Sequence, residues 1–257
     1  MPVGSAVHRL RSVTSTNDAA RELALAGAAH GTAVIAAEQT RGRGTKGRDW
    51  HSPSGLGLYA SFILRGPANG PVPSPHLLPL AAGLAAADAV LAAAGVPVRL
   101  KWPNDLVHHG KKLGGILSEG VSGGPDGGFA VVGVGLNVGH GPDDFPAALR
   151  DTSTSLRLIG AGPVSVESVF DELCRSLDCW YNALARGERE AIVTTFEARA
   201  ALPSGEPVRV TTAEGTWSGV CRGLDADGRL VVEREGGAGP VALAAVLRID
   251  RLRQGGL

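Results

Sequence analysis

The most informative stretch of this sequence runs from Arg41 to Trp50, RGRGTKGRDW. Four cationic side chains, Arg41, Arg43, Lys46 and Arg48, stand among three glycines, and a tryptophan closes the segment. Guanidinium forks and free backbone N–H groups bind the oxygens of phosphates and carboxylates. The segment therefore predicts a site for an anion, either a phosphate or a carboxylate that becomes joined to one.

A second segment, KWPND from Lys101 to Asp105, combines a cation, an aromatic ring and an amide–carboxylate pair around a proline. The proline bends the backbone, so several polar groups can point at one place. Lys112 follows, just before Gly114 and Gly115, where a backbone can approach a ligand closely. A purely local interpretation remains open, in which Asn104 and Asp105 only bond the backbone of a turn.

The basic glycine segment has alternative interpretations. It is compatible with a solvated surface loop, or with a patch that contacts nucleic-acid phosphates without reading sequence. It is not a P-loop, because GxxxxGK followed by Ser or Thr is missing, and it is not placed as a Rossmann turn before a helix. A clamp for one small anionic ligand is the most economical interpretation.

Other polar groups give weaker signals. A helix cap explains Ser15-Thr16-Asn17, and the glycines of Gly133–Asn137 are compatible with a bulge in a strand. The seven histidines have no spacing typical of a metal cage or a catalytic triad. The three cysteines are odd in number and lack CxxC spacing, which favours reduced thiols in a cytoplasmic protein.

Composition limits the class of protein. A hydrophobic content of 44% and a charged content of 19% are typical of a globular protein. Lys plus Arg equals Asp plus Glu at 25 each, so no overall field favours nucleic acid or anionic lipid. The first residues, MPVGSAVHRLRS, contain no apolar h-region, so we expect no secretory signal. Asp88 interrupts the Ala/Leu run 77–96, which favours a buried helix over a membrane span.

Periodicity and turn signals predict the elements that position these residues. We expect the strands at 98–102, 111–119 and 129–138 to form a consecutive antiparallel run, with an SGGPDGG turn before the last of them. Further strands are expected at 33–38 and 57–64, and helices from Ser15 to about Gly27, at 77–95, 166–184 and 191–201.

The residue pattern changes near residues 202–205, from helical periodicity to short β-type segments. Four short β-type segments follow, PVRVTT, WSGVCRGL, RLVVER and PVALAAV, separated by turn residues. We therefore predict two domains, 1–203 and 204–257, the second being a small β-barrel or sandwich that packs on the first.

In order, STN, EQTRGRGTKGRDW, KWPNDL, KKLGGIL and VGVGLN resemble the motif set of the biotin protein ligases, over most of residues 12–140. The resemblance implies an α/β (α+β) fold. Its catalytic domain would be of the class II synthetase and lipoate-ligase type, with a mixed, largely antiparallel sheet, packed helices and a C-terminal SH3-like β-barrel. It also implies the ligase-only class without an N-terminal DNA-binding domain. Thr45 departs from the pattern, since many members have arginine there.

The resemblance implies ATP-dependent ligation of biotin to a lysine of a biotin carboxyl carrier domain of acyl-CoA carboxylases, through biotinoyl-5′-AMP. Biotin and ATP would be substrates with Mg²⁺, and Asp105 is a candidate magnesium ligand. We expect a cytoplasmic enzyme with no nucleic-acid or membrane partner, and a homodimer is possible. The resemblance also implies roles for individual residues. Those implied in catalysis are Lys112, Arg43, Arg48 and Asp105. Those implied in biotin binding are Ser15, Thr16, Asn17, Gln39, Gly42, Arg43, Lys112, Gly115 and Gly133, and those implied in ATP binding are Arg48, Trp50, Lys101, Asn104 and Asn137, with Arg248 as a further contact to the triphosphate.

Two alternatives remain open. One is a lipoate or octanoate ligase of the same fold, which shares the adenylation step but needs an apolar pocket for its tail. The other is a non-catalytic sensor of biotin or nucleotide.

Overall fold

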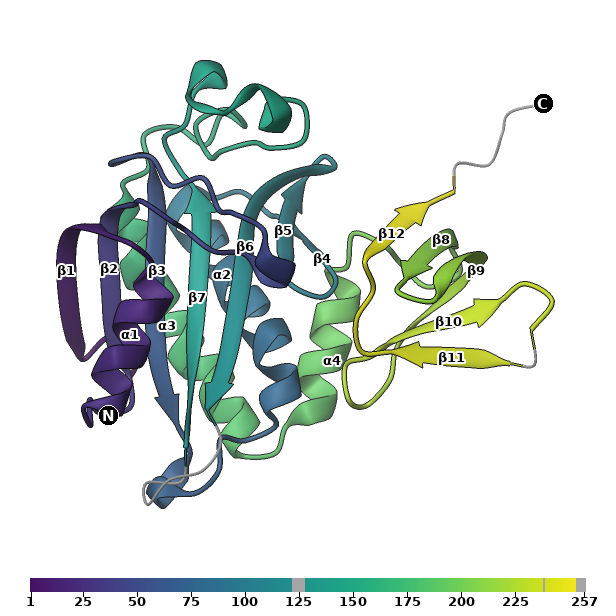
Figure 1. Ribbon diagram of the computed structural model, residues 1–257, viewed down its shortest axis with the longest axis horizontal. Coiled ribbons are helices and arrows are strands. Elements are labelled where there is room, and N and C mark those ends of the chain that lie inside the picture. The colour runs from purple at the N-terminus through teal and green to yellow at the C-terminus, as the bar shows by residue number, and fades with distance from the viewer. Residues whose placement is uncertain (122–127, 238, 253–257) are drawn as a thin grey trace.

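The structure is a computed structural model that describes residues 1–121, 128–237 and 239–252. Most of the predicted SGGPDGG turn falls on residues 122–127, outside the described residues. The described elements form a seven-stranded sheet and a five-stranded sheet (Figure 1). The predicted α/β class with a largely antiparallel sheet is confirmed.

The seven-stranded sheet has the order β1-β2-β3-β7-β6-β5-β4. β1 and β2 are parallel, and every other neighbouring pair is antiparallel. Its strands are β1 (Ala6–Val13), β2 (Thr32–Gln39), β3 (Gly57–Arg65), β4 (Arg99–Lys101), β5 (Asp105–His108), β6 (Lys111–Val121) and β7 (Phe129–Asn137).

The sequence pattern does not predict β1 or β5. β1 is an edge strand with half-buried or exposed side chains, so it lacks the apolar alternation of a core strand. β5 has only four residues and lies where we expect a turn. It pairs with both β4 and β6, so the predicted direct neighbourhood of 98–102 and 111–119 is wrong.

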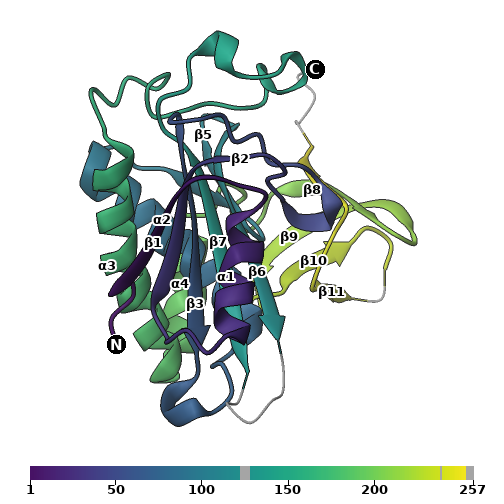
Figure 2. The same ribbon diagram turned by 60° about the vertical axis from the view of Figure 1, so that its left-hand side comes forward.

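Side chains alternate between the two faces of this sheet. Phe62 and Val132 point into the main core, which α2 and α3 cover, whereas Ile63 and Val131 pack with residues of α1 on the opposite face. Figures 1 and 2 show α1 alone on one face and the other three helices together on the other. The helices are α1 (Thr16–Leu25), α2 (Leu78–Ala94), α3 (Val166–Ala185) and α4 (Arg189–Ala198), with single 3₁₀ turns η1 (Thr45–Gly47), η2 (Pro67–Asn69), η3 (Pro75–Leu77), η4 (Pro142–Asp144) and η5 (Ala147–Leu149).

α2 accounts for the long Ala/Leu run. By length and composition it could cross a membrane, but here most of it is buried against α3 and the sheet. Asp88, which interrupts the run, accepts hydrogen bonds from Trp180 Nε1 at 2.7 Å and from Arg199. The carboxylate therefore fastens α2 to α3 and to the end of α4. Gly95 ends the helix in the left-handed conformation, with φ of 67°.

Residues 207–251, called the tail below, form the five-stranded antiparallel sheet β11-β10-β9-β8-β12 around a small core of their own. β12 is not predicted by the sequence pattern. Among the described residues no ladder joins the short edge strands β11 and β12, so the sheet is open and the expected closed barrel is not found. The strands are β8 (Pro207–Thr212), β9 (Gly215–Leu224), β10 (Leu230–Arg234), β11 (Pro240–Leu243) and β12 (Arg248–Arg251).

Trp102 joins the tail to the large sheet. Its Nε1 donates to the carbonyl oxygen of Gly228 at 2.9 Å, and its ring packs against the apolar clusters of both sheets. Nearby, the Leu224 N–H donates to the Glu197 carboxylate at 2.7 Å. The tryptophan of KWPND therefore positions the tail.

Candidate active site

A cavity of about 420 Å³ lies on the α1 face of the large sheet, beside the first turn of α1. This volume is typical of small-molecule sites, which range over roughly 300–1,000 Å³. Motifs far apart in the sequence meet here, and all predicted site residues line the cavity except Gly42 and Arg248. The others do: Ser15, Thr16, Asn17, Gln39, Arg43, Arg48, Trp50, Lys101, Asn104, Asp105, Lys112, Gly115, Gly133 and Asn137.

The floor of the cavity is a part of the sheet with few side chains. Gly115 pairs with Gly135, and Gly133 pairs with Leu117 on one side and with Ser61 on the other. Two-residue alternation places all five on the α1 face. α1 has ten residues and packs on the neighbouring apolar part of this face, and its Asn17 side chain reaches Gly133.

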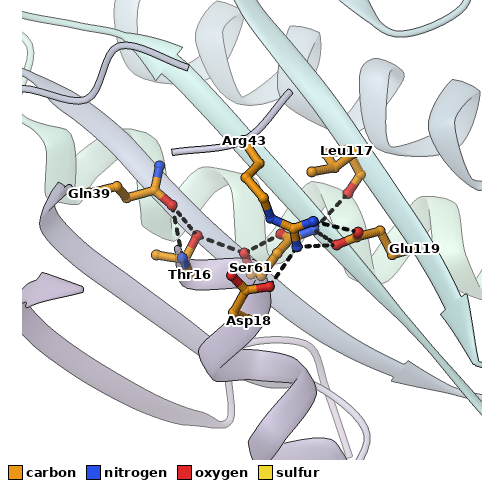
Figure 3. A network of polar contacts seen from close by, with 8 residues as sticks. Thr16, Asp18, Gln39, Arg43, Ser61, Leu117 and Glu119 are labelled. Carbon is orange, nitrogen blue, oxygen red and sulfur yellow. Dashed lines mark hydrogen bonds and ion pairs between the residues drawn. The ribbon is translucent and has the colours of Figure 1, made fainter. Parts of the chain in front are cut away.

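A helix cap does not explain the Ser15-Thr16-Asn17 motif. Ser15 occupies the N-cap position of α1, but its side chain makes no capping hydrogen bond. Thr16 and Asn17 are buried and form a polar row with Gln39 and Ser61. Figure 3 shows Thr16, Gln39 and Ser61 of this row. The Ser61 hydroxyl lies 2.8 Å from Thr16 Oγ1 and 2.6 Å from Asn17 Oδ1, and Thr16 N–H donates to Gln39 Oε1 at 2.8 Å.

Partners that only donate or only accept fix both amides of this polar row. Gln39 must turn Oε1 toward the Thr16 N–H, while its Nε2 donates to Ser52 Oγ at 2.9 Å. Asn17 must turn Nδ2 toward the Glu119 carboxylate at 2.7 Å, which leaves Oδ1 for the Ser61 hydroxyl. The row therefore presents a fixed pattern of donors and acceptors.

Two floor glycines make room for protein side chains. A Cβ at Gly133 would lie 2.1 Å from Asn17 Oδ1, and one at Gly135 would lie 2.6 Å from the Trp50 ring. At Gly115 the nearest atoms are 3.3 Å away, on the flexible Lys112 side chain. The described structure thus connects Gly133 to the polar row, whereas the resemblance implied that Gly133 binds biotin.

Lys112 and Asp105 form an ion pair at the cavity wall, with 2.7 Å between Nζ and Oδ1. The ammonium also lies 5.3 Å from the centroid of the Trp50 ring, a cation–π distance. An ammonium has three N–H donors, and a single neighbouring carboxylate oxygen can occupy at most one of them. Lys112 can therefore bind an additional anionic group from the cavity while Asp105 holds it in place.

The basic glycine segment is a small hairpin. Arg43 and Asp49 form a β-bridge, and Trp50 N–H donates to the Gly42 carbonyl at 2.8 Å. A Cβ at Gly42 would lie 2.5 Å from the Trp50 carbonyl oxygen, so this glycine permits the hairpin to close. Gly42 therefore supports the hairpin and does not itself line the cavity.

Thr45 and Lys46 form the tip of this hairpin. Arg48 donates from Nε to the Thr45 carbonyl and from Nη2 to Thr45 Oγ1, each at 3.3 Å, so threonine here supports the neighbouring arginine. Lys46 has a φ of 61° and donates to the carbonyl oxygen of Val246 in the tail. Burial and the nearby Arg48 lower the pKa of Lys46.

Two predicted ATP-binding amides bond the protein backbone. Asn104 Nδ2 donates to the Ile116 carbonyl at 2.8 Å, and Asn137 Nδ2 donates to the Thr154 carbonyl at 2.9 Å. Both donors thus bond the backbone of other segments, so the interpretation of Asn104 and Asp105 as residues that only bond the backbone of a turn is not what the structure shows; both asparagines line the cavity. Lys101 lines it from β4.

Sequence reasoning missed Ser61, Asp18 and Glu119, which complete the polar row and its surroundings (Figure 3). A serine within the apolar segment GLYASFIL was the available signal for Ser61, since a buried hydroxyl needs a partner. Asp18 lies in the first turn of α1, where acidic residues are common, so its position in the sequence gives no sign of a role at the site.

The described residues contain no group of three or more His, Cys, Asp or Glu side chains that could hold a metal ion. Two carboxylates, those of Asp49 and Asp105, line the cavity, and Asp105 is paired with Lys112. Such an arrangement suits Mg²⁺ only when substrate phosphates supply further ligands.

Comparison with known proteins assigns the family. The profile of the Biotin/lipoate A/B protein ligase family matches residues 9–137, and that of the biotin protein ligase C-terminal domain matches residues 204–248. The chain is 33% identical over 244 residues to the biotin–[acetyl-CoA-carboxylase] ligase of Paracoccus denitrificans, covering 92% of this chain and 98% of that protein. The chain belongs to the biotin protein ligase family.

Other relatives agree with this assignment. The bifunctional ligase/repressor BirA of Bacillus spizizenii is 35% identical over 225 residues, covering 88% of this chain and 68% of that protein. The biotin protein ligase of Aquifex aeolicus, solved in complex with biotin and ATP, superposes with a TM-score of 0.80 at 28% identity. That match covers 96% of this chain and all of the other.

Proposed function

We propose that this protein joins biotin to a protein lysine in an ATP-dependent reaction that passes through biotinoyl-5′-AMP. Relatives across most of its length are named as biotin ligases, and a structural neighbour binds biotin and ATP. The acceptor we propose is the lysine of a biotin carboxyl carrier domain.

One observation carries this proposal: the cavity places a polar row of fixed orientation and a positioned lysine on the same strip of sheet. Asn17 contacts β7 at Gly133, and Trp50 contacts it at Gly135, beside Lys112. Two residues along a strand span about 7 Å. The arrangement suits a ligand with a compact ureido head and a carboxylate tail.

The first step activates the carboxylate, which is a poor electrophile by itself. A carboxylate oxygen of biotin attacks the α-phosphorus of ATP, a C(O)–O–P linkage forms, and the bond to pyrophosphate breaks. Lys112 stabilises the negative charge near the carboxylate and then on the acyl phosphate. Arg48 and Lys101 face the phosphates, and Mg²⁺ bound by Asp105 and the phosphates would neutralise further charge.

The second step transfers the acyl group. The neutral amine of the acceptor lysine attacks the carbonyl carbon, AMP leaves, and the amine loses a proton. A free lysine is mostly protonated at neutral pH, so the acceptor needs a proton acceptor or a less polar surrounding. Asp105 lies beside the reacting end of the cavity and is our candidate for orienting this amine.

Biotin-dependent exchange between ATP and pyrophosphate tests the first step with purified protein. We expect exchange that requires biotin, and transfer of label to a carrier domain when that domain is added. Absence of exchange with folded, biotin-binding protein would favour a sensor instead.

The alternative acid ligases are distinguished by calorimetry with biotin, lipoate and octanoate. An apolar tail would exclude water from the polar row at Thr16 and Asn17 and would not use the remaining donor and acceptor capacity of these groups, which is costly. We therefore expect biotin to bind at least a hundredfold more tightly than octanoate. Equal affinity would contradict the assignment of the row to a ureido group.

A further inference from the structure

Arg43 lies between two carboxylates that belong to different elements. Its Nη2 is 2.7 Å from Asp18 Oδ1 on α1 and 3.0 Å from Glu119 Oε2 on β6, and its Nη1 is 3.1 Å from Glu119 Oε1. Figure 3 shows the guanidinium between them. One side chain of the hairpin is thus bound both to the helix and to the strand that frame the cavity.

Glu119 also forms a hydrogen bond with the polar row. Its Oε2 accepts from Asn17 Nδ2 at 2.7 Å, and this bond fixes the orientation of the Asn17 amide. Asp18 follows Asn17 directly in α1. Neither Asp18 nor Glu119 lines the cavity, so any effect on a ligand must pass through Asn17 and Arg43.

We propose that Asp18 and Glu119 are positioning residues that form an acidic clasp on Arg43, holding the hairpin 41–50 closed over the head of the ligand. The clasp sets how fast biotin enters and how long biotinoyl-5′-AMP is retained. It contacts none of the reacting atoms. Its link to biotin rests on the proposed function, but its effect on the hairpin does not.

The chemistry of the three groups explains why arginine is needed. A planar guanidinium can donate to both carboxylates at once, whereas a lysine ammonium lacks this fork geometry. Opening the hairpin removes the cation and leaves two carboxylates near each other. The side chains of Arg43, Asp18 and Glu119 are 42%, 46% and 35% exposed, so each ion pair is weak and sensitive to salt.

The hairpin itself supplies a test that needs no ligand. Trypsin cleaves after lysine and arginine, and the hairpin 41–50 offers Arg41, Arg43, Lys46 and Arg48. We expect the double variant Asp18→Asn/Glu119→Gln to be cleaved at these sites about three- to tenfold faster than the unmodified protein, as expected for losing two exposed ion pairs. Glu22→Gln is the matched control, because Glu22 is exposed on α1 one turn after Asp18. Equal cleavage of the double variant and the control would overturn the clasp.

Salt distinguishes the clasp from a general loss of structure. Raising the ionic strength from about 0.02 to 0.5 M should accelerate cleavage of the unmodified protein and of Glu22→Gln, because it screens the ion pairs. The double variant should respond much less. A salt response in the double variant as large as in the control would contradict an electrostatic clasp.

Ligand kinetics then test the positioning role. Association and dissociation of biotin, followed by tryptophan fluorescence, should both accelerate in the double variant, and KM for biotin should change more than kcat for pyrophosphate exchange. The single variant Asp18→Glu keeps a carboxylate at this position, so it should release biotin as slowly as the unmodified protein. If the unmodified protein fails to bind biotin, the proposed function fails while the trypsin result still judges the clasp. If it binds and the variants match Glu22→Gln, the clasp fails alone.

Discussion

Lys112 Nζ lies 2.7 Å from Asp105 Oδ1 and close to the face of the Trp50 ring, so one carboxylate and one aromatic ring hold this ammonium at the cavity wall. Lys112→Ala removes a charge that is already in position. We expect adenylate formation to fall by on the order of a hundredfold or more. The measurement is biotin-dependent pyrophosphate exchange.

The neighbouring Lys111 provides the matched control for this substitution. It is exposed on the same strand and does not line the cavity. Lys111→Ala should exchange pyrophosphate at the normal rate. Near-normal exchange in Lys112→Ala would remove Lys112 from the mechanism.

Gly133 and Gly115 should respond differently to alanine. A Cβ at 133 would lie 2.1 Å from Asn17 Oδ1, and Asn17 cannot easily yield because Ser61 and Glu119 hold it. A Cβ at 115 meets the flexible Lys112 side chain at 3.3 Å and the Trp50 ring at an ordinary contact distance of 3.5 Å. We expect Gly133→Ala to weaken biotin binding by more than tenfold, and Gly115→Ala by a few-fold, measured by calorimetry. The reverse order would contradict the fixed polar row.

The sequence predicts the strands and helices that have strong periodicity, and it fails where the signal is weak for a physical reason. β3 and β7 are apolar because both faces are covered, so their patterns are clear. β1 lies at an edge with much of its surface exposed, and β5 is four residues long and follows a proline. Their pairing depends on neighbours that a local pattern does not contain.

The motif residues reach one cavity as predicted, but their individual contacts could not be predicted. Asn17 and Asn104 are the same residue type in comparable motifs, yet one joins the polar row and the other bonds the backbone of β6. The difference depends on which strand lies opposite each amide. That information belongs to the sheet register.

His140 should make stability depend on pH. It is fully buried and stacked on Phe145, and burial lowers its pKa from 6.5 to about 4. Between these values the unfolded chain binds a proton that the folded protein does not, so stability is lost as pH falls from about 6.5 toward 4. The loss attributable to this residue approaches about 3 kcal/mol at the lower end.

Urea unfolding of His140→Phe at several pH values isolates that contribution. Phenylalanine keeps a ring of similar shape beside Phe145 and does not titrate. We expect the variant to gain stability relative to the unmodified protein as the pH falls through this window. A constant difference between the two proteins would show that His140 does not titrate as described.

Trp102→Phe tests whether the KWPND tryptophan serves the tail or the ligand. The substitution removes the bond to the Gly228 carbonyl and leaves that oxygen without its donor, at a cost of about 1–2 kcal/mol. We expect a lower midpoint in urea unfolding and unchanged biotin affinity. Loss of biotin affinity with unchanged stability would place the ring in the ligand site instead.

The hairpin that covers the cavity is held by both sheets. Arg43 is bound to α1 and β6, while Lys46 reaches the Val246 carbonyl, 200 residues further along the chain. The tail is therefore not an interchangeable module. A chimera that carried a relative's tail would retain a complete cavity and still close it poorly, unless the segment between β11 and β12, which contains Val246, kept the same backbone path.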